Sequence, residues 1–305
     1  MKVVTTREEL RTARAELEVG PDTAGGDITV AGAARPSGVG RRSVGLVPTM
    51  GFLHEGHLSL VRRAREENDA TVVSIFVNPT QFGPSEDLEA YPRDLDHDLA
   101  LLDGAGVDLV WTPQVEDVYP AGFDTYVTPG GVADVLEGAR RPGHFRGVAT
   151  IISILFHLCA PDRAYFGQKD AQQVAVIRQL VRDLGLPVEI VACPIVREPD
   201  GLAMSSRNTY LAAADRPAAL VLSRALQAAG RAWADGEGDA EALRTILRDV
   251  ITAEPRAVVD YVSVADPRTL AELTAVDPAV GALASLAVRV GAPRLIDNLV
   301  LAPRA

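Results

Sequence analysis

Apolar runs alternate with helical patterns through the first two thirds of the chain. Five runs are continuously apolar and short enough to be buried strands, at residues 44–47, 71–77, 109–112, 163–166 and 188–193. Between them, apolar residues recur at helical spacing over residues 57–67, 94–102, 148–158 and 171–184. Buried strands separated by helices predict an α/β fold, a Rossmann-like parallel sheet with helices on both faces.

The two ends of the chain show different patterns. Thr6 and Glu9 form a capping-box pattern that predicts a first helix ending near residue 19. Residues 20–43 are rich in Gly and small polar residues, and we interpret them as a Gly-rich insertion with a weak hairpin at 28–30.

The pattern changes again after residue 196. Two alanine-rich helical patterns precede three strand-like segments; the helices are expected at 216–234 and 241–254 and the strands at 258–264, 285–290 and 294–300. We therefore predict a smaller α+β domain at residues 196–305, which closes over a site on the sheet domain at residues 1–195.

Composition and charge narrow the class of protein. The chain has 305 residues, of which 47% are hydrophobic and 23% charged, so a large core and two domains are expected. A net charge of −11 argues against a nucleic-acid partner. The N-terminus lacks a signal-peptide core, and the longest apolar run, 148–160, is too short to span a membrane. Cys159 and Cys193 are too few for a disulfide framework, which favours a reduced, cytoplasmic location.

Polar clusters follow three of the predicted strands, at residues 50–57, 78–81 and 167–170. The carboxyl ends of parallel strands meet at one edge of a sheet, and α/β proteins bind their ligands there. We therefore expect the three clusters to converge on one site.

The segment from Met50 to His57 joins a predicted strand to the first turn of a helix. Unpaired N–H groups and a partial positive charge make such a turn suitable for phosphate. His54 and His57 add donors on the same side, and Gly56 leaves room for a flat ring against the backbone. The segment predicts a nucleoside triphosphate site. Helix capping and packing is an alternative role for the two imidazoles, and zinc binding is another, although no third ligand stands at a suitable spacing.

Two further clusters offer complementary chemistry. Gly167 permits close approach of backbone N–H groups to a phosphate, and Lys169 supplies a mobile charge. Gln173 lies one turn after Lys169 and can face the same pocket. Asn78 and Gln81 offer neutral amides that suit a small hydroxylated acid. Each cluster is also compatible with an ordinary polar loop or helix start.

Residues 200–208 form a loop at the predicted domain boundary. Ser205, Ser206 and Arg207 make a compact anion-binding set there. A plain surface linker is the alternative, but the position at a boundary favours a loop that closes over a ligand. Residues 143–147 precede an apolar helix, and their spacing alone assigns them no role.

Together these motifs resemble those of the pantothenate synthetase (pantoate–β-alanine ligase) family. The matching blocks, in order over nearly the whole chain, are PTMGFLHEGH, FVNPTQF, YPRDLDHDL, GHFRGVAT, PDRAYFGQKDAQQ, REPDGLAMSSRN and RLIDN. The first and sixth blocks are also similar to the HIGH and KMSKS elements of the class I nucleotidylyl-transferase superfamily. The resemblance implies that (R)-pantoate and ATP give pantoyl adenylate and pyrophosphate, after which β-alanine displaces AMP to give pantothenate. It also implies Mg²⁺ dependence and a homodimer.

The same resemblance implies roles for individual residues. Those implied to contact ATP are Met50, Gly51, Phe52, Leu53, His54, Glu55, Gly56, His57, Gly167, Gln168, Lys169, Asp170, Val196, Met204, Ser205, Ser206 and Arg207. Those implied to be catalytic are His54, His57, Lys169, Ser205, Ser206 and Arg207, with His57 as a general acid. Gln81, Gln173 and Asn78 are implied to bind pantoate, and Gln81 also β-alanine.

Two positions in the site depart from the family pattern. Gln168 stands where the family usually has glutamate, and Ala171 where it usually has an aromatic residue. Because Lys169 and Asp170 are present, we expect tuning of the activity rather than its loss.

Two other functions are compatible with the nucleotide motifs. A related nucleotidylyl transferase would activate a different acid, without the pair Gln81 and Gln173. A non-catalytic nucleotide-binding paralogue would have lost one of His57, Lys169 and Arg207, yet all three are present.

Overall fold

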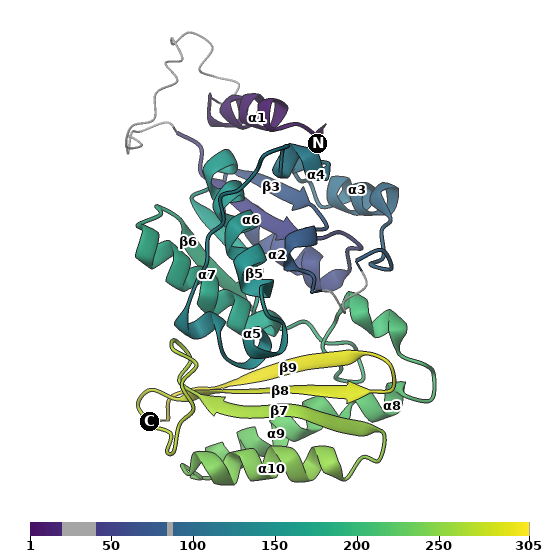
Figure 1. Cartoon of the computed structure of the whole chain (residues 1–305), viewed down its shortest axis with the longest axis vertical. Helices are drawn as coiled ribbons and strands as arrows, with labels where there is room; N and C mark the ends of the chain where they lie inside the picture. The colour runs from purple at the N-terminus through teal and green to yellow at the C-terminus, as the bar shows by residue number, and fades with distance from the viewer. Residues whose placement is uncertain (20–40, 84–87, 305) are drawn as a thin grey trace.

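The computed structural model describes residues 1–19, 41–83 and 88–304. The hairpin expected at 28–30, and the predicted insertion up to residue 40, lie outside the described residues. The described chain forms a six-stranded parallel sheet and a separate three-stranded antiparallel sheet (Figure 1). The predicted fold class, a parallel α/β sheet followed by a smaller α+β unit, is confirmed.

The parallel sheet has the strand order β1-β4-β3-β2-β5-β6. Its strands are β1 (Lys2–Val4), β2 (Val44–Thr49), β3 (Ala70–Ile75), β4 (Leu109–Trp111), β5 (Arg163–Gly167) and β6 (Glu189–Cys193). The sequence predicted all of these except β1. That strand has only three residues and pairs with β4, which lies more than a hundred residues further along the chain, so it leaves no local pattern.

Helices cover both faces of the parallel sheet. One face carries α1 (Arg7–Val19), α6 (His144–Cys159) and α7 (Ala171–Leu184), and the other carries α2 (Glu55–Glu67) and α3 (Leu95–Gly104). Successive residues of β2 divide between the two cores: Val44 and Leu46 belong to the first, Val47 to the second. This division explains why the strands are continuously apolar. Shorter elements are α4 (Val115–Val118), α5 (Leu136–Arg140) and the 3₁₀ turns η1 (Pro79–Gln81), η2 (Gly131–Ala133) and η3 (Gln168–Asp170).

The C-terminal unit places a sheet against the parallel-sheet unit and helices beyond it (Figure 1). Its antiparallel strands are β7 (Ala257–Ala265), β8 (Ala282–Val290) and β9 (Arg294–Leu301). The 3₁₀ turn η4 (Ser206–Tyr210) and helices α8 (Arg216–Ala219), α9 (Val221–Ala234) and α10 (Ala240–Thr252) complete it. The helix predicted at 216–234 is interrupted at Leu220, which divides α8 from α9. We retain residues 1–195 and 196–305 as our interpretation of the two domains.

In the described part of the chain, no helix is both long enough and apolar enough to cross a membrane.

Helix α6 begins at His144, four residues earlier than the apolar pattern predicted. Its first turns pack closely on η1. A Cβ atom at Gly147 would lie only 2.4 Å from the carbonyl oxygen of Thr80. Glycine at this position therefore sets the distance between α6 and the turn that carries Gln81.

We predict that Gly147→Ala destabilises the protein even though alanine is the better helix former. The helix propensity gain of about 1 kcal/mol is outweighed by a backbone clash that costs about 1–3 kcal/mol in a packed core. Urea unfolding measures the difference. Gly104→Ala, in the last turn of α3 with no atom near the added methyl group, is the matched control and should be neutral or slightly stabilising. Equal stability of the Gly147 variant and wild type would contradict this account of the contact.

Candidate active site

A cleft opens beyond the carboxyl ends of β2, β3 and β5, where the strand order reverses between β2 and β5. It encloses about 1460 Å³, including the part open to solvent. The residues predicted from the sequence that line it are Met50, His54, Gly56, His57, Asn78, Gln81, Gly167, Lys169, Asp170, Gln173, Val196, Met204, Ser205, Ser206 and Arg207. The three polar clusters and the loop at the domain boundary thus meet at one site.

Five residues expected at the nucleotide lie outside the cleft lining, namely Gly51, Phe52, Leu53, Glu55 and Gln168. Glu55 forms an ion pair with Arg62 at the surface. Gln168 turns toward β9 and donates to the Oδ1 atom of Asn298 (3.3 Å). Their contact with a nucleotide stays a prediction.

The turn that carries Gly51, Phe52 and Leu53 leads directly into His54 at the start of α2. Gly51 and Phe52 adopt left-handed backbone conformations, with φ of 80° and 50°, and such a conformation costs a non-glycine residue about 1–2 kcal/mol. The carboxylate of Asp98, on α3, accepts the N–H groups of Phe52 (2.8 Å) and Leu53 (2.7 Å). Burial raises the pKa of Asp98, while these two donors act to lower it. No local sequence pattern indicates this role of Asp98, because the contact with Leu53 spans 45 residues.

The side chains of His54 and His57 cap the start of α2. The Nδ1 atom of His54 accepts the N–H of Gly56 (3.1 Å), and the Nδ1 atom of His57 accepts the N–H of His54 (3.3 Å). The ring centroids lie 4.1 Å apart. A neutral ring that accepts at Nδ1 carries its proton on Nε2. Helix capping therefore gives both histidines an Nε2–H donor, and capping and ligand binding are compatible roles rather than alternatives.

Both imidazoles are neutral at pH 7. Burial, with further contributions from His54 and Lys169, lowers the pKa of His57 to about 3. Burial and Lys169 also lower the pKa of His54. Any positive charge offered to an anion here comes from other residues. In the described part of the chain, no group of three His, Cys, Asp or Glu side chains could hold a metal ion, which argues against the zinc alternative.

Lys169 and Asp170 stand side by side on η3, at the end of β5. The Lys169 Nζ atom lies 3.5 Å from Asp170 Oδ1. Burial alone would raise the pKa of Asp170, but Lys169 and Arg207 outweigh it and hold the pKa below its usual value. Among the described residues that line the cleft, Asp170 is the only carboxylate, so the site is positively charged within an acidic protein.

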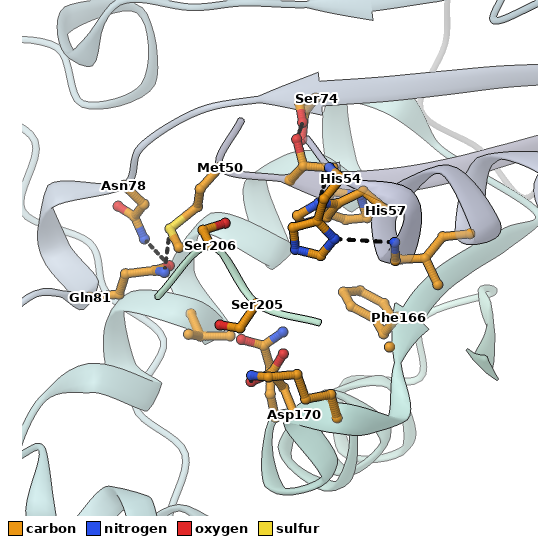
Figure 2. A pocket seen from close by; sticks show the side chains of 18 of the residues that line it. Met50, His54, His57, Ser74, Asn78, Gln81, Phe166, Asp170, Ser205 and Ser206 are labelled. Carbon is orange, nitrogen blue, oxygen red and sulfur yellow. Dashed lines mark hydrogen bonds and ion pairs between the residues drawn. The ribbon is translucent and has the colours of Figure 1, made fainter. Parts of the chain in front are cut away.

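Asn78 and Gln81 form a rigid amide pair on the opposite side of the cleft from the histidines (Figure 2). Asn78 Nδ2 donates to Gln81 Oε1 (3.1 Å) and to the carbonyl of Gly147 (3.2 Å). The ring of His144 hydrogen-bonds the Gln81 carbonyl oxygen through Nδ1 (2.8 Å). The Nε2 group of Gln81 points to the sulfur of Met50 (2.9 Å), a weak acceptor, and is well placed to donate to a ligand.

The loop that carries Ser205 and Ser206 lies between the two sides of the cleft in this view (Figure 2). Its base is fixed where the N–H of Met204 donates to the carbonyl of Val196 (2.9 Å). Beyond it, Ser205 caps η4 by accepting the N–H of Arg207 (3.3 Å). The serine hydroxyls and the guanidinium therefore enter the cleft from a short turn.

Five further polar residues that line the cleft had no role predicted from the sequence: Thr49, Ser74, Tyr91, Arg141 and His144. Tyr91 and His144 lie in sequence blocks that had been noted, but local spacing did not show which way they face. Burial raises the pKa of Tyr91, and the hydrogen bond with Ser206 partly opposes that shift. This contact joins the loop after residue 88 to η4.

Comparisons with known proteins agree with the motifs. The family model described as pantoate-beta-alanine ligase matches residues 29–300. Pantothenate synthetase of Herpetosiphon aurantiacus is 58% identical over 301 residues, covering 99% of this chain and 100% of the relative. That of Roseiflexus sp. is 59% identical over 301 residues and 99% of each chain.

Solved structures agree as well. Pantothenate synthetase from Thermus thermophilus is 46% identical with a TM-score of 0.87, covering 99% of this chain and 100% of that one. Pantoate-beta-alanine ligase from Francisella tularensis, complexed with beta-gamma ATP and β-alanine, is 31% identical with a TM-score of 0.75, covering 100% of both chains.

We predict that His54 and His57 carry their protons on Nε2 at pH 7 in the free protein. Their Nδ1 atoms accept backbone N–H groups, and burial disfavours the imidazolium. Because the pKa of His57 lies well below the 6.5 of an exposed imidazole, the ring should stay neutral as the pH falls from 7 to 5. Ring ¹⁵N chemical shifts report both states. An Nδ1–H tautomer of either ring, or an imidazolium of His57 at pH 6, would contradict this prediction.

Proposed function

This chain belongs to the pantoate–β-alanine ligase family, and we propose that it joins its substrates in two steps within the cleft of His54, His57 and Lys169. The overall reaction is the ATP-dependent ligation of pantoate with β-alanine, which gives pantothenate, AMP and pyrophosphate. The proposed intermediate is an enzyme-bound pantoyl adenylate. The roles of individual residues below are part of the proposal.

One observation supports the proposal most strongly: two different donor sets face the same cleft. His54, His57, Lys169 and the turn at 205–207 supply hydrogen-bond donors and cations suited to a triphosphate. Gln81 and Gln173, which line the same cleft, supply neutral amides suited to a hydroxylated acid. A site that activates a carboxylic acid with ATP needs both sets within reach of one phosphorus atom.

In the first step, a pantoate carboxylate oxygen attacks the α-phosphorus of ATP in line with the departing pyrophosphate. The carboxylate is already ionised, so this step needs no general base, and the protein acts by orientation and charge stabilisation. Lys169 and Arg207 stabilise negative charge that develops on pyrophosphate. The Nε2–H groups of His54 and His57 donate to phosphate oxygens without carrying charge. Binding of the polyanion would raise the pKa of both rings, which is how His57 could become a proton donor.

In the second step, the amine of β-alanine attacks the acyl carbon of the adenylate, and AMP leaves with the bonding electrons. The mixed anhydride must be protected from water until the amine arrives. The turn at 204–207 enters the cleft from the domain boundary and can provide this protection. We assign to Gln81 a contact with both pantoate and β-alanine.

Magnesium belongs to the proposal as a companion of ATP. The cleft offers a single carboxylate, Asp170, among the described residues, and this fits an ion held mainly by substrate phosphates. Bound there, Mg²⁺ would neutralise phosphate charge. Activity that persists in excess chelator would contradict this part of the proposal.

We also propose a homodimer, closure of the C-terminal domain over the cleft, and a cytoplasmic location. Both cysteines are free thiols, which is consistent with a reducing compartment. Sedimentation equilibrium and cell fractionation test the assembly and the location. Small-angle scattering with and without substrates tests the closure.

Exchange of labelled pyrophosphate into ATP tests the proposed intermediate. We expect exchange that requires pantoate and proceeds without β-alanine, because adenylate formation is reversible in the cleft. Exchange with a different acid alone would favour another nucleotidylyl transferase. ATP binding without any exchange would favour a non-catalytic nucleotide-binding protein.

We predict that Lys169→Ala and His57→Ala each lower kcat by roughly 10²–10³, the scale for loss of one preorganised donor at developing charge. Steady-state kinetics with saturating substrates measure the effect. Glu66→Ala is the control for His57→Ala, because it changes an exposed residue of the same helix, α2, outside the cleft lining. Wild-type turnover in both site variants would refute these roles.

For Gln81→Ala, we expect the KM for pantoate to rise more than about 10-fold, with a smaller change in the KM for ATP, because an amide on the acid side is removed. Initial rates at varied pantoate and fixed ATP give the comparison. Gln179→Ala, which removes the same side-chain amide from α7 outside the cleft lining, is the control. An unchanged pantoate KM would place the acid elsewhere.

A further inference from the structure

Asn298 connects the C-terminal sheet to the turn that carries Lys169. It lies on β9 opposite Ser285 of β8, and only 3% of its surface is exposed. Its Nδ2 group donates to the carbonyl oxygens of Gln168 and Lys169, both at 2.9 Å. Its Oδ1 atom accepts from Gln168 Nε2 at 3.3 Å. All of its side-chain polar atoms are thus directed at one short turn 130 residues earlier in the chain.

The geometry of this turn determines where the Lys169 ammonium lies. The 3₁₀ turn η3 has only three residues between β5 and α7, and it places Lys169 in the cleft with 16% of its side chain exposed. A long lysine side chain has many rotamers, so its ammonium is held in one place only if its backbone is held as well. Two hydrogen bonds to successive carbonyls provide that restraint.

Asp297, the residue before Asn298 on β9, connects through Arg197 to the base of the 204–207 turn. Asp297 is 2% exposed and accepts two hydrogen bonds from Arg197, at 2.6 and 3.0 Å. Arg197 follows Val196, whose carbonyl holds Met204 at the base of the 204–207 turn. Two consecutive residues of one strand therefore reach both the lysine turn and the base of the serine loop.

We propose that Asn298 is a positioning residue for Lys169, through which the C-terminal sheet sets the place of the ammonium in the cleft. This inference rests on the proposed role of Lys169 at the phosphates. Asn298 is not among the residues that line the cleft. Its effect on the reaction is exerted through the backbone of η3.

The chemistry of the contact requires an amide. The two carbonyl oxygens need an N–H donor. Alanine has no such donor, and a carboxylate would repel the carbonyl oxygens. Gln168 completes the match, because its Nε2 group donates to the one acceptor of Asn298.

The first test is kinetic and uses the full-length protein. We expect Asn298→Ala to lower kcat for pantoate-dependent exchange by roughly 10–100-fold, the scale for misplacement of a catalytic group, with little change in the pantoate KM. Asn298→Asp keeps the side-chain volume and should be at least as slow. Tyr261→Phe is the matched control: it removes a hydrogen bond to Glu137 across the same interface (2.9 Å) without touching η3, and should leave kcat unchanged.

The second test separates positioning from a general structural role. If Asn298 acts through Lys169, then Asn298→Ala should cause no further loss, less than about twofold, in a Lys169→Ala background. A merely structural role would multiply the two losses. Thermal unfolding of each variant shows that folded proteins are compared, and Asn298→Asp decides the question if Asn298→Ala does not fold.

The third test needs no activity. Lys2 and Lys169 are the only lysines of the chain, so protein labelled with ¹⁵N-lysine gives two backbone amide resonances. Asn298→Ala should shift the Lys169 resonance and leave that of Lys2, on β1, in place. Tyr261→Phe should move neither.

The outcomes distinguish this inference from the proposed function. Absence of exchange in the wild type would overturn the proposed function, while the amide resonances would still test the placement of η3. Wild-type kcat in Asn298→Ala, an unmoved Lys169 resonance, or multiplicative losses in the double variant would overturn the role of Asn298.

Discussion

The cleft depends on how β2 and β5 pair at the centre of the parallel sheet. These strands share only two register pairs, Gly45 with Arg163 and Leu46 with Ala164, whereas β2 and β3 share six. The pairing therefore stops at the amino-terminal half of the two strands, and their carboxyl ends separate. Chain segments leave those ends in opposite directions, toward α2 and toward η3, as expected at a switch point. The first of these segments carries His54 and His57, and the second carries Lys169 and Asp170.

Within this cleft the hydrogen-bond donors and the charges come from different residues. The same Nδ1 contacts that cap α2 fix the tautomers of His54 and His57, and burial keeps both rings neutral. Positive charge comes instead from Arg141, Lys169 and Arg207, which all line the cleft. Arginine fills nearly every cationic position of this chain, since Lys2 and Lys169 are its only lysines. The ammonium of a lysine is compact and sits on a flexible side chain, whereas the guanidinium of an arginine is planar. The cleft keeps a lysine, Lys169, beside Asp170.

Much of this arrangement could be predicted from local sequence. Strand ends, helix starts and short motifs each lie within a short stretch of chain. Their patterns therefore predicted β2 to β6, α2, α3, α7 and fifteen of the residues that line the cleft. The supports of the site could not be read in this way. Asp98 reaches Leu53 across 45 residues and Asn298 reaches Lys169 across 129, and neither contact leaves a periodic pattern. For the same reason β1 was missed, and α6 was expected to begin four residues late, because its first turn is buried against η1 rather than within an apolar run.

The long-range supports also indicate how the two units act on one another. Arg294 of β9 forms ion pairs with Glu137 of α5 and with Asp260 of β7, which anchors the C-terminal sheet beside the parallel-sheet unit. On the same strand, Asp297 holds Arg197 and Asn298 holds η3. A displacement of β9 would therefore move the lysine turn and the base of the 204–207 turn together. In the closure that we propose, the 204–207 turn and the ammonium of Lys169 would move together toward the phosphates, because β9 contacts the supports of both.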